Sequence, residues 1–339
     1  MKKKKQIESI SLQNGEYLEK EFTTYQEMAE HSPDWSLYCN YQLEPNGMDG
    51  RYKIIELSNM QISHSDMVGG FMFSFEAPKE RVCFSIIESI EGTACFESMK
   101  LKPGMIVVFD DRRAYNFMSS AKIKLVDVSL DKGIAAPLIK TLLDAEQKYF
   151  VDTDNIMLHT LLEIFNTYGE DVEKEVVASV EEMIISTMTT LISDQEAQVP
   201  QCTKGEQTAL TIRDKVFKHM DGQLNSITLA EEYQITTQTL QNSFKSLFGY
   251  TPQRFLRLLK LNLVHHELYE STERETTVSR VAQKWGFEHM GRLSGYYKEL
   301  FGETPSVTLK EEDHEDDGMR LGCVERKEEF VGGGTFLTL

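Results

Sequence analysis

The stretch Leu240-Gln-Asn-Ser-Phe-Lys-Ser-Leu-Phe-Gly-Tyr-Thr-Pro252 recurs in altered form as Leu293-Ser-Gly-Tyr-Tyr-Lys-Glu-Leu-Phe-Gly-Glu-Thr-Pro305. The two copies lie 53 residues apart, and seven of their positions are identical. Two copies are too few for a solenoid, in which several units must stack to build a core. The repetition therefore predicts one supersecondary unit that the chain uses twice.

Each copy carries the signals for a helix, a sharp stop and a second helix. Leu240, Phe244 and Leu247 recur at helical spacing and form an apolar stripe. Gly249 follows where a left-handed C-terminal cap favours glycine. The pair Thr251-Pro252 then supplies an N-cap and the residue favoured at the first helical position.

A short amphipathic segment precedes each stripe and ends in a turn. Ala230 lies four residues before Gln234 in the first copy, and Ala282 lies four before Gly286 in the second. A small residue where two helices cross, then a turn and a second helix, is typical of a helix-turn-helix. One copy alone would fit an ordinary helical hairpin equally well, and the repetition favours the helix-turn-helix.

The run Val281-Ala-Gln-Lys-Trp-Gly-Phe-Glu-His-Met-Gly-Arg-Leu-Ser-Gly-Tyr-Tyr-Lys-Glu-Leu-Phe-Gly-Glu-Thr-Pro-Ser306 resembles the signature of the AraC/XylS family of bacterial transcription regulators. The resemblance covers residues 208–309 and departs at Gln234, where the family often has glycine. It implies two helix-turn-helix units, at about 227–248 and 278–301, joined by a long helix. It also implies double-stranded operator DNA and RNA polymerase as partners, and activation more often than repression.

In a helix-turn-helix, residues near the start of the second helix reach base edges in the major groove. The apolar stripe predicts that polar residues of the first unit face away from the core, where Gln and Asn can bind adenine bidentately. An ordinary polar helix face is the alternative. The predicted DNA-contacting residues of this unit are Thr237, Gln238, Gln241, Asn242 and Lys245.

The second recognition helix is predicted to begin near Glu288. Matching the family motif by position places Met290, Gly291, Ser294 and Gly295 nearest the bases, which offers few hydrogen bonds. We expect this unit to read phosphates, a thymine methyl group and DNA shape. Its predicted contact residues are His289, Met290, Gly291, Arg292, Ser294 and Lys298, with Arg292 and Lys298 on phosphates.

The N-terminal half shows strand-like patterns in place of the helical stripes described above. Residues 35–130 hold strand-like runs broken by Gly, Pro and Asp, which is typical of a sandwich or barrel. Leu101-Lys-Pro-Gly-Met-Ile-Val-Val-Phe109 resembles the turn and strand of cupin-like barrels. Residues 134–194 show helical spacing, and the stripe containing Val180 and Met183 either packs on the barrel or forms a dimer interface.

The predicted fold class is α+β with two domains: a cupin-like β-barrel followed by helices, then an all-α domain. The expected boundaries are 1–194 for effector sensing and dimerisation, 195–207 for a linker, 208–309 for the DNA-binding domain, and 310–339 for an acidic, disordered tail.

Composition excludes several classes of function. The net charge is −18, yet acidic and basic residues nearly balance within 207–309, which leaves that segment able to bind DNA. The five cysteines show no CxxC pair, which predicts a reducing cytoplasm and no zinc site. Only His31 and His64 precede residue 150, too few for a cupin metal centre. No nucleophile motif, phosphate loop or dinucleotide fingerprint occurs, and no run has the length of a membrane helix.

We therefore expect a cytoplasmic, homodimeric transcription regulator without catalytic residues, metal or cofactor. Its N-terminal domain is expected to sense an unknown small effector, to dimerise, or both. The alternative is a protein-interaction factor that acts mainly through its acidic N-terminal half and binds DNA only secondarily.

Overall fold

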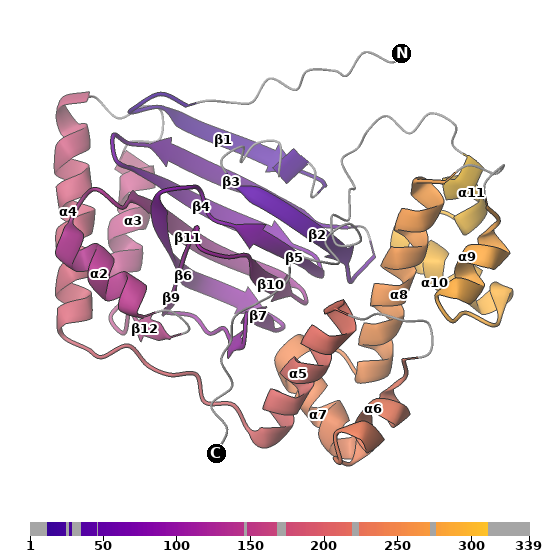
Figure 1. The fold of residues 1–339 in the computed structure, drawn as a ribbon. Helices are drawn as coiled ribbons and strands as arrows, with labels where there is room; N and C mark the ends of the chain where they lie inside the picture. The colour runs from indigo at the N-terminus through magenta and orange to yellow at the C-terminus, as the bar shows by residue number, and fades with distance from the viewer. Residues whose placement is uncertain are drawn as a thin grey trace.

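The computed structural model describes residues 12–24, 27–28, 35–45, 47–145, 148–167, 174–218, 224–271 and 276–310. Its N-terminal part is built from two β-sheets with helices on one side, and its C-terminal part is helical (Figure 1). This arrangement confirms the predicted two-part α+β fold. The predicted acidic tail lies outside the described residues, apart from its first residue, Lys310.

The strands pair antiparallel in two separate sheets. The described strands form no ladder between the sheets, so the N-terminal part is an open two-sheet structure and differs from a closed barrel. In sheet order, the seven-stranded sheet contains β1 (Tyr17–Phe22), β3 (Asp49–Glu56), β4 (Met60–Val68), β11 (Lys122–Asp131), β6 (Arg81–Glu91), β9 (Met105–Asp110) and β12 (Tyr149–Val151). The five-stranded sheet contains β2 (Ser36–Gln42), β5 (Phe71–Glu76), β10 (Tyr115–Ser119), β7 (Ala94–Phe96) and β8 (Met99–Lys100).

Alternation along the strands assigns each side chain to one of two layers. On β9, Val107 and Phe109 point between the sheets, whereas Ile106 and Val108 point to the outer layer of helices. Because successive side chains of a strand face opposite sides, a strand buried on both faces must be apolar at nearly every position. All six residues of β9 are buried accordingly.

Three helices cover the outer face of the seven-stranded sheet (Figure 1). They are α2 (Ala136–Asp144), α3 (Ile156–Thr167) and α4 (Lys174–Ser193). One face of α4, carrying Val180, Ile184 and Met188, is buried in the core that these helices share with the sheet. By length and composition, Val176–Ser193 could also cross a membrane, which differs from the sequence expectation. One third of that window is buried, along the face that packs on the sheet.

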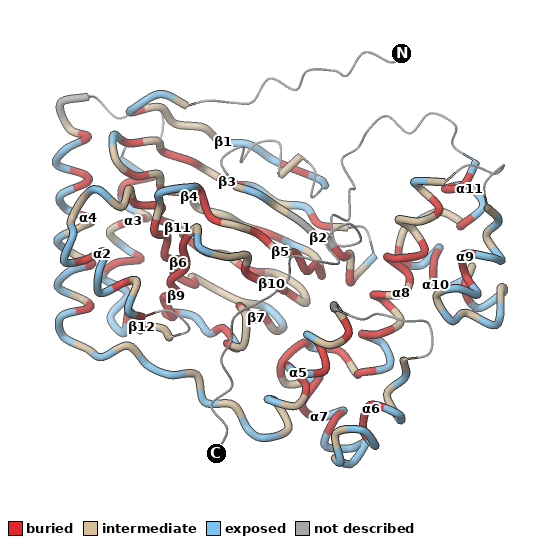
Figure 2. Tube along the Cα trace, in the orientation of Figure 1, coloured by how far each residue is buried: buried red, intermediate tan, exposed pale blue. Residues whose placement is uncertain are grey.

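The C-terminal part consists of α5 (Lys204–Lys218), α6 (Ser226–Glu232), α7 (Thr237–Phe248), α8 (Pro252–Tyr269), α9 (Val278–Lys284), α10 (Met290–Phe301) and α11 (Pro305–Lys310). Its first helix begins within the segment expected to be a linker. The buried residues of α8 lie at the centre of this part, with exposed faces on the surrounding helices (Figure 2). Phe244, Phe248 and Phe255 pack there with ring centroids 5.1–5.6 Å apart.

The two parts of the molecule share a continuous hydrophobic core. Met72 of β5, Cys95 of β7 and Met118 of β10 are buried in the same cluster as the C-terminal helices. Their strand neighbours Phe73, Phe96 and Phe117 point to the opposite side, between the sheets. The five-stranded sheet is therefore a wall with the C-terminal helices on one face and the inter-sheet core on the other.

Polar contacts fix this arrangement. Buried Asn262 of α8 donates to the carbonyl of Gln42 and accepts from its amide, each at 2.8 Å. The Gln42 side chain donates to the carbonyl of Leu300 at the end of α10. Arg254 donates to both carboxylate oxygens of Glu44 at 2.8 and 2.9 Å. The end of β2 thereby holds the long helix and the second predicted unit together.

Candidate functional site

The first helix-turn-helix consists of α6, a tight turn and α7. Asn225 caps α6 by accepting from the amides of Ile227 and Thr228, and Thr236 caps α7 by accepting from the amide of Thr239. Gln234 adopts the left-handed conformation at the turn, with φ of 51°. The turn that the family often builds with glycine is therefore built here with a glutamine, at a cost of about 1–2 kcal/mol.

The predicted contact residues of the first unit form one exposed surface on α7. Leu240, Phe244 and Leu247 are buried, which turns the opposite face of the helix outward. The Gln238 side chain donates to the side-chain oxygen of Asn242 at 2.9 Å, so these two amides are already aligned with each other. The exposed set on this face is Thr237, Gln238, Gln241, Asn242 and Lys245.

The second unit consists of α9, a turn through Gly286 with φ of 80°, and α10. Helix α10 begins at Met290, two residues after the predicted start, because His289 occupies the N-cap position. His289, Gly291, Arg292, Gly295 and Lys298 are exposed, as predicted from the motif. Met290 and Ser294 are half-buried, and Met290 packs against the hydrophobic core. Less of Met290 is accessible to a thymine methyl group than the sequence suggested.

Two glycines interrupt the exposed face of α10. A Cβ atom built on Gly291 or on Gly295 would meet nothing within 4 Å. Each glycine in a helix interior costs about 1 kcal/mol relative to alanine. Packing within the chain therefore does not explain why these positions lack side chains, whereas a partner that approaches the backbone closely would.

Helix α8 connects the two units rigidly. Its 18 residues span about 27 Å at 1.5 Å per residue. The His265 ring stacks on Phe301 with centroids 4.2 Å apart, and its Nδ1 lies 2.5 Å from the hydroxyl of Tyr297. On the other side, Lys260 donates to the carbonyl of Leu224 at 2.9 Å. The predicted burial of this helix is observed.

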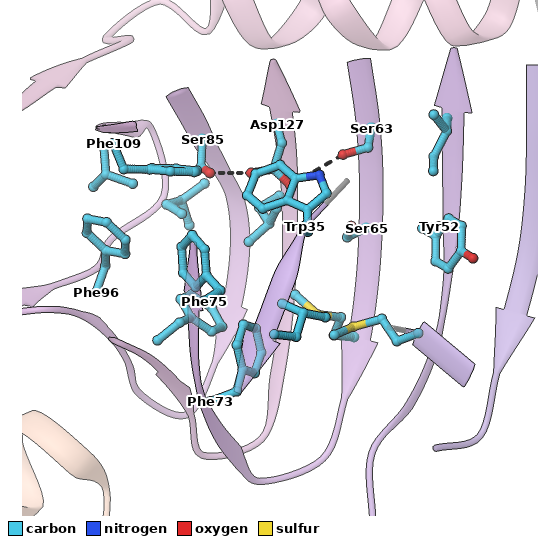
Figure 3. Close-up of a pocket in the computed structure, with 18 of the residues that line it drawn as sticks. Trp35, Tyr52, Ser63, Ser65, Phe73, Phe75, Ser85, Phe96, Phe109 and Asp127 are labelled. Atoms are coloured by element: carbon cyan, nitrogen blue, oxygen red, sulfur yellow. Dashed lines mark hydrogen bonds between the residues drawn. The ribbon is translucent and has the colours of Figure 1, made fainter. Parts of the chain in front are cut away.

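The structure also contains a partly open cavity that sequence reasoning missed. It lies between the sheets, has a volume of about 120 Å³, and is walled mainly by aromatic and aliphatic side chains (Figure 3). Polar groups line one side: Ser63 and Ser65 of β4, Ser85 of β6 and Asp127 of β11. The inward positions of β11 read Ile123, Leu125 and Asp127, so an acidic residue in an otherwise apolar alternation was the available signal.

Asp127 is held by two hydroxyl groups. Ser85 makes a short hydrogen bond to one carboxylate oxygen, and Ser63 donates to the other at 3.4 Å. Burial raises the pKa of Asp127 from 3.8 to about 6, while both hydroxyls act in the opposite direction. The carboxyl group is therefore mostly ionised at neutral pH, in a cavity that is mainly apolar and partly open to solvent.

The described residues contain no group of three or more His, Cys, Asp and Glu side chains arranged to hold a metal ion. The polar residues that line the cavity are three serines, a glutamine, a tyrosine and one carboxylate. Among the described residues of this lining there is no His, Cys or Lys that could serve as the base or nucleophile of a catalytic group. The arrangement is suited to binding.

Comparison with known proteins finds similarity in the C-terminal part of the chain. Residues 229–311 match a family model described as a helix-turn-helix domain. The chain is 31% identical over 97 residues to the probable thc operon regulatory protein of Rhodococcus erythropolis, covering 29% of each chain. It is 36% identical over 81 residues to the XylDLEGF operon transcriptional activator 2 of Pseudomonas putida, covering 24% of this chain and 52% of the relative.

The matches therefore span only part of each protein: about a third of the XylDLEGF operon transcriptional activator and about half of the activator just described. Among solved structures, the AraC-like transcriptional activator CuxR matches with a TM-score of 0.40 at 13% identity, covering 65% of this chain and 83% of that one. The repeated unit, its turn geometry and these sequence matches agree. The C-terminal helix-turn-helix domain of this chain is therefore of the AraC/XylS type.

Proposed function

We propose that this protein is a sequence-specific regulator of transcription that binds double-stranded DNA through α7 and α10. The observation that carries the proposal is the pair of exposed helix faces, each at the start of the second helix of a helix-turn-helix unit. In that position a helix can enter the major groove. The buried helix α8 would hold the two faces at a fixed separation, close to one turn of DNA.

Each unit contributes a different kind of contact in this proposal. Gln238, Gln241 and Asn242 would read adenine edges, because their amides donate and accept in the pattern that adenine presents in the major groove. Arg292 and Lys298 would contact phosphates, with Lys245 as the equivalent cation on α7. Gly291 and Gly295 would let the backbone of α10 come close to the DNA surface.

We assign effector control to the N-terminal sheets. The five-stranded sheet separates the cavity from the C-terminal helices, and neighbouring residues on one strand touch the two sides. A molecule that enters the cavity would press on Phe73, Phe96 and Phe117, and their neighbours contact the DNA-binding part. Such a ligand would shift the population between two presentations of the units.

We further propose that the protein activates transcription, contacts RNA polymerase, forms a homodimer and acts in the cytoplasm. The named relatives include transcriptional activators, which supports activation. For dimerisation, α4 offers the face opposite to its buried stripe, where Met183 is 42% exposed. Light scattering on the purified chain tests dimerisation, and substitution of Met183 by lysine should shift a dimer towards monomer.

Selection of full-length protein against a pool of randomised DNA duplexes, at two salt concentrations, tests DNA binding. We expect a motif with two short blocks about one helical turn apart, and an affinity that falls as salt rises. Failure to enrich a motif at either salt concentration would contradict the proposal. It would favour the protein-interaction alternative.

Gln241→Ala then tests the orientation of the first unit. It should weaken binding to the selected duplex, whereas Glu231→Ala, which changes an exposed residue of α6, should leave sequence preference unchanged. Equal effects of the two substitutions would contradict the assignment of α7 as the recognition helix.

A further inference from the structure

The cavity between the sheets is partly open, and the space inside it is small. Its volume of about 120 Å³ is slightly smaller than an engineered apolar cavity of about 150 Å³ that binds benzene in another protein. A single ring or a short alkyl chain with one substituent therefore matches the space. Molecules with several polar groups, such as sugars, do not match the largely apolar lining.

Aromatic rings form one end of the cavity. The ring of Trp35 lies 5.8 Å from that of Phe75 and 5.9 Å from that of Phe109, and Phe75 lies 5.3 Å from Phe109. All three line the cavity (Figure 3). The faces of such rings carry negative potential and attract cations placed within about 6 Å.

Asp127 gives the cavity a formal charge. It is the only acidic residue among the described residues that line the cavity, and no Lys, Arg or His lines it. An ionised carboxylate in apolar surroundings is costly unless it is paired with a cation. Its two hydrogen bonds come from the neutral hydroxyls of Ser63 and Ser85, which leave its charge uncompensated.

We propose that this cavity binds a small organic cation, a primary ammonium group on a body the size of one ring, with Asp127 as its counter-ion. An ammonium group carries three hydrogen-bond donors. Asp127 would accept one, and the hydroxyls of Ser63 and Ser65 on β4 lie on the same polar side to accept the others. The apolar body would fill the space among Trp35, Phe75 and Phe109.

Other ligand charges fit this site less well. A carboxylate of the same size would meet the like charge of Asp127 among mainly apolar side chains, where repulsion is stronger than in bulk water. A neutral hydrocarbon would fill the aromatic end and leave the carboxylate without a counter-ion. An alcohol would donate one hydrogen bond and leave the charge uncompensated. The geometry therefore predicts the order amine, alcohol, carboxylate for molecules of equal shape.

That such a cation is the effector rests on the proposed function, whereas its binding can be tested without DNA. We would measure calorimetric binding and thermal shift for full-length protein at pH 7.5 with benzylamine, benzyl alcohol and benzoate. A second matched pair, n-butylamine and 1-butanol, separates charge from ring shape. In at least one pair we expect the amine to bind ten-fold or more tightly than the alcohol, with no measurable binding of benzoate.

Asp127→Asn removes the charge with little change in shape. It should reduce amine affinity at least ten-fold and leave alcohol affinity within two-fold. Asp154→Asn, at an exposed loop position, is the matched control and should change neither. Amines that bind no better than their alcohols in both pairs would overturn the proposal, as would benzoate as the tightest ligand. These wild-type comparisons decide the question even if the Asp127 variant does not fold.

The outcomes separate this inference from the proposed function. Amine binding that depends on Asp127 but leaves DNA affinity unchanged would support the cation site and contradict its role as an effector site. Selective DNA binding together with no amine preference would overturn the cation site and leave the regulator proposal intact.

Discussion

Replacing Gly291 and Gly295 by alanine should affect folding and DNA binding in opposite directions. Both positions lie inside α10, and an added Cβ atom would meet nothing within 4 Å. Alanine is favoured over glycine in a helix interior by about 1 kcal/mol. The double variant should therefore gain about 1–2 kcal/mol in its free energy of unfolding, because Gly295 lies in the helix interior whereas Gly291 lies in the first turn of α10. Urea denaturation followed by circular dichroism measures this gain.

The same two methyl groups would stand between α10 and a DNA surface. Loss of a close contact in such an interface costs about 1–3 kcal/mol of binding free energy. Fluorescence anisotropy with the selected duplex should show this weakening in the more stable protein. Gly302→Ala is the control, because Gly302 also has open space around it but adopts φ of 79°. That substitution should destabilise the fold.

One result would refute the reasoning. If both alanine variants become more stable and bind the duplex as tightly as the parent protein, then nothing approaches this face of α10. The glycines would then have no role in DNA contact, and the second unit would have to bind through another surface.

Gln241→Ala should cost about 1–3 kcal/mol in affinity for the selected duplex, and sequencing of a new selection should show relaxed preference at one base position. Gln234→Gly should raise the free energy of unfolding by about 1 kcal/mol in a urea titration, because Gln234 has φ of 51° and glycine adopts that conformation without strain. Asp127→Asn should stabilise the protein by at most about 3 kcal/mol above pH 6, because the pKa of Asp127 is raised from 3.8 to about 6. The folded parent binds that proton more tightly than the unfolded chain, so the contribution of Asp127 to stability is greatest below pH 4 and is lost as pH rises through 6. Denaturation of parent and variant across pH 4–8 should show the difference between them growing in that window.

The helix-turn-helix units could be predicted because their signals are local. Thr251 and Pro252 begin α8, and Gly249 and Gly302 end the preceding stripes in left-handed conformations. Each signal acts within one turn of its own position, so the spacing along the chain is sufficient to interpret it. The exposed faces of α7 and α10 then follow from which residues are apolar.

The N-terminal part could be predicted only in outline. Alternation indicated strands, but the pairing of β1 with β3 and the division into two sheets depend on contacts between distant residues. The cavity gathers side chains from ten strands, and no local pattern shows that Ser63, Ser85 and Asp127 meet. Gln42 and Asn262 likewise lie 220 residues apart, and their paired hydrogen bonds could not be inferred from either neighbourhood.

The five-stranded sheet carries different kinds of side chain on its two faces. The residues that it presents to the C-terminal helices include Met72, Cys95, Met118 and Tyr41, whereas Phe73, Phe96 and Phe117 face the space between the sheets. Methionine is flexible and polarisable and repacks at little cost, whereas aromatic side chains have few conformations. The three sulfur-containing side chains can therefore repack against the C-terminal helices more easily than the phenyl rings on the other face can rearrange. Deletion of one residue within β5 would turn Met72 towards the cavity and Phe73 towards the C-terminal helices along part of that strand. The register of this one strand therefore determines both the lining of the cavity and the contact with the DNA-binding part.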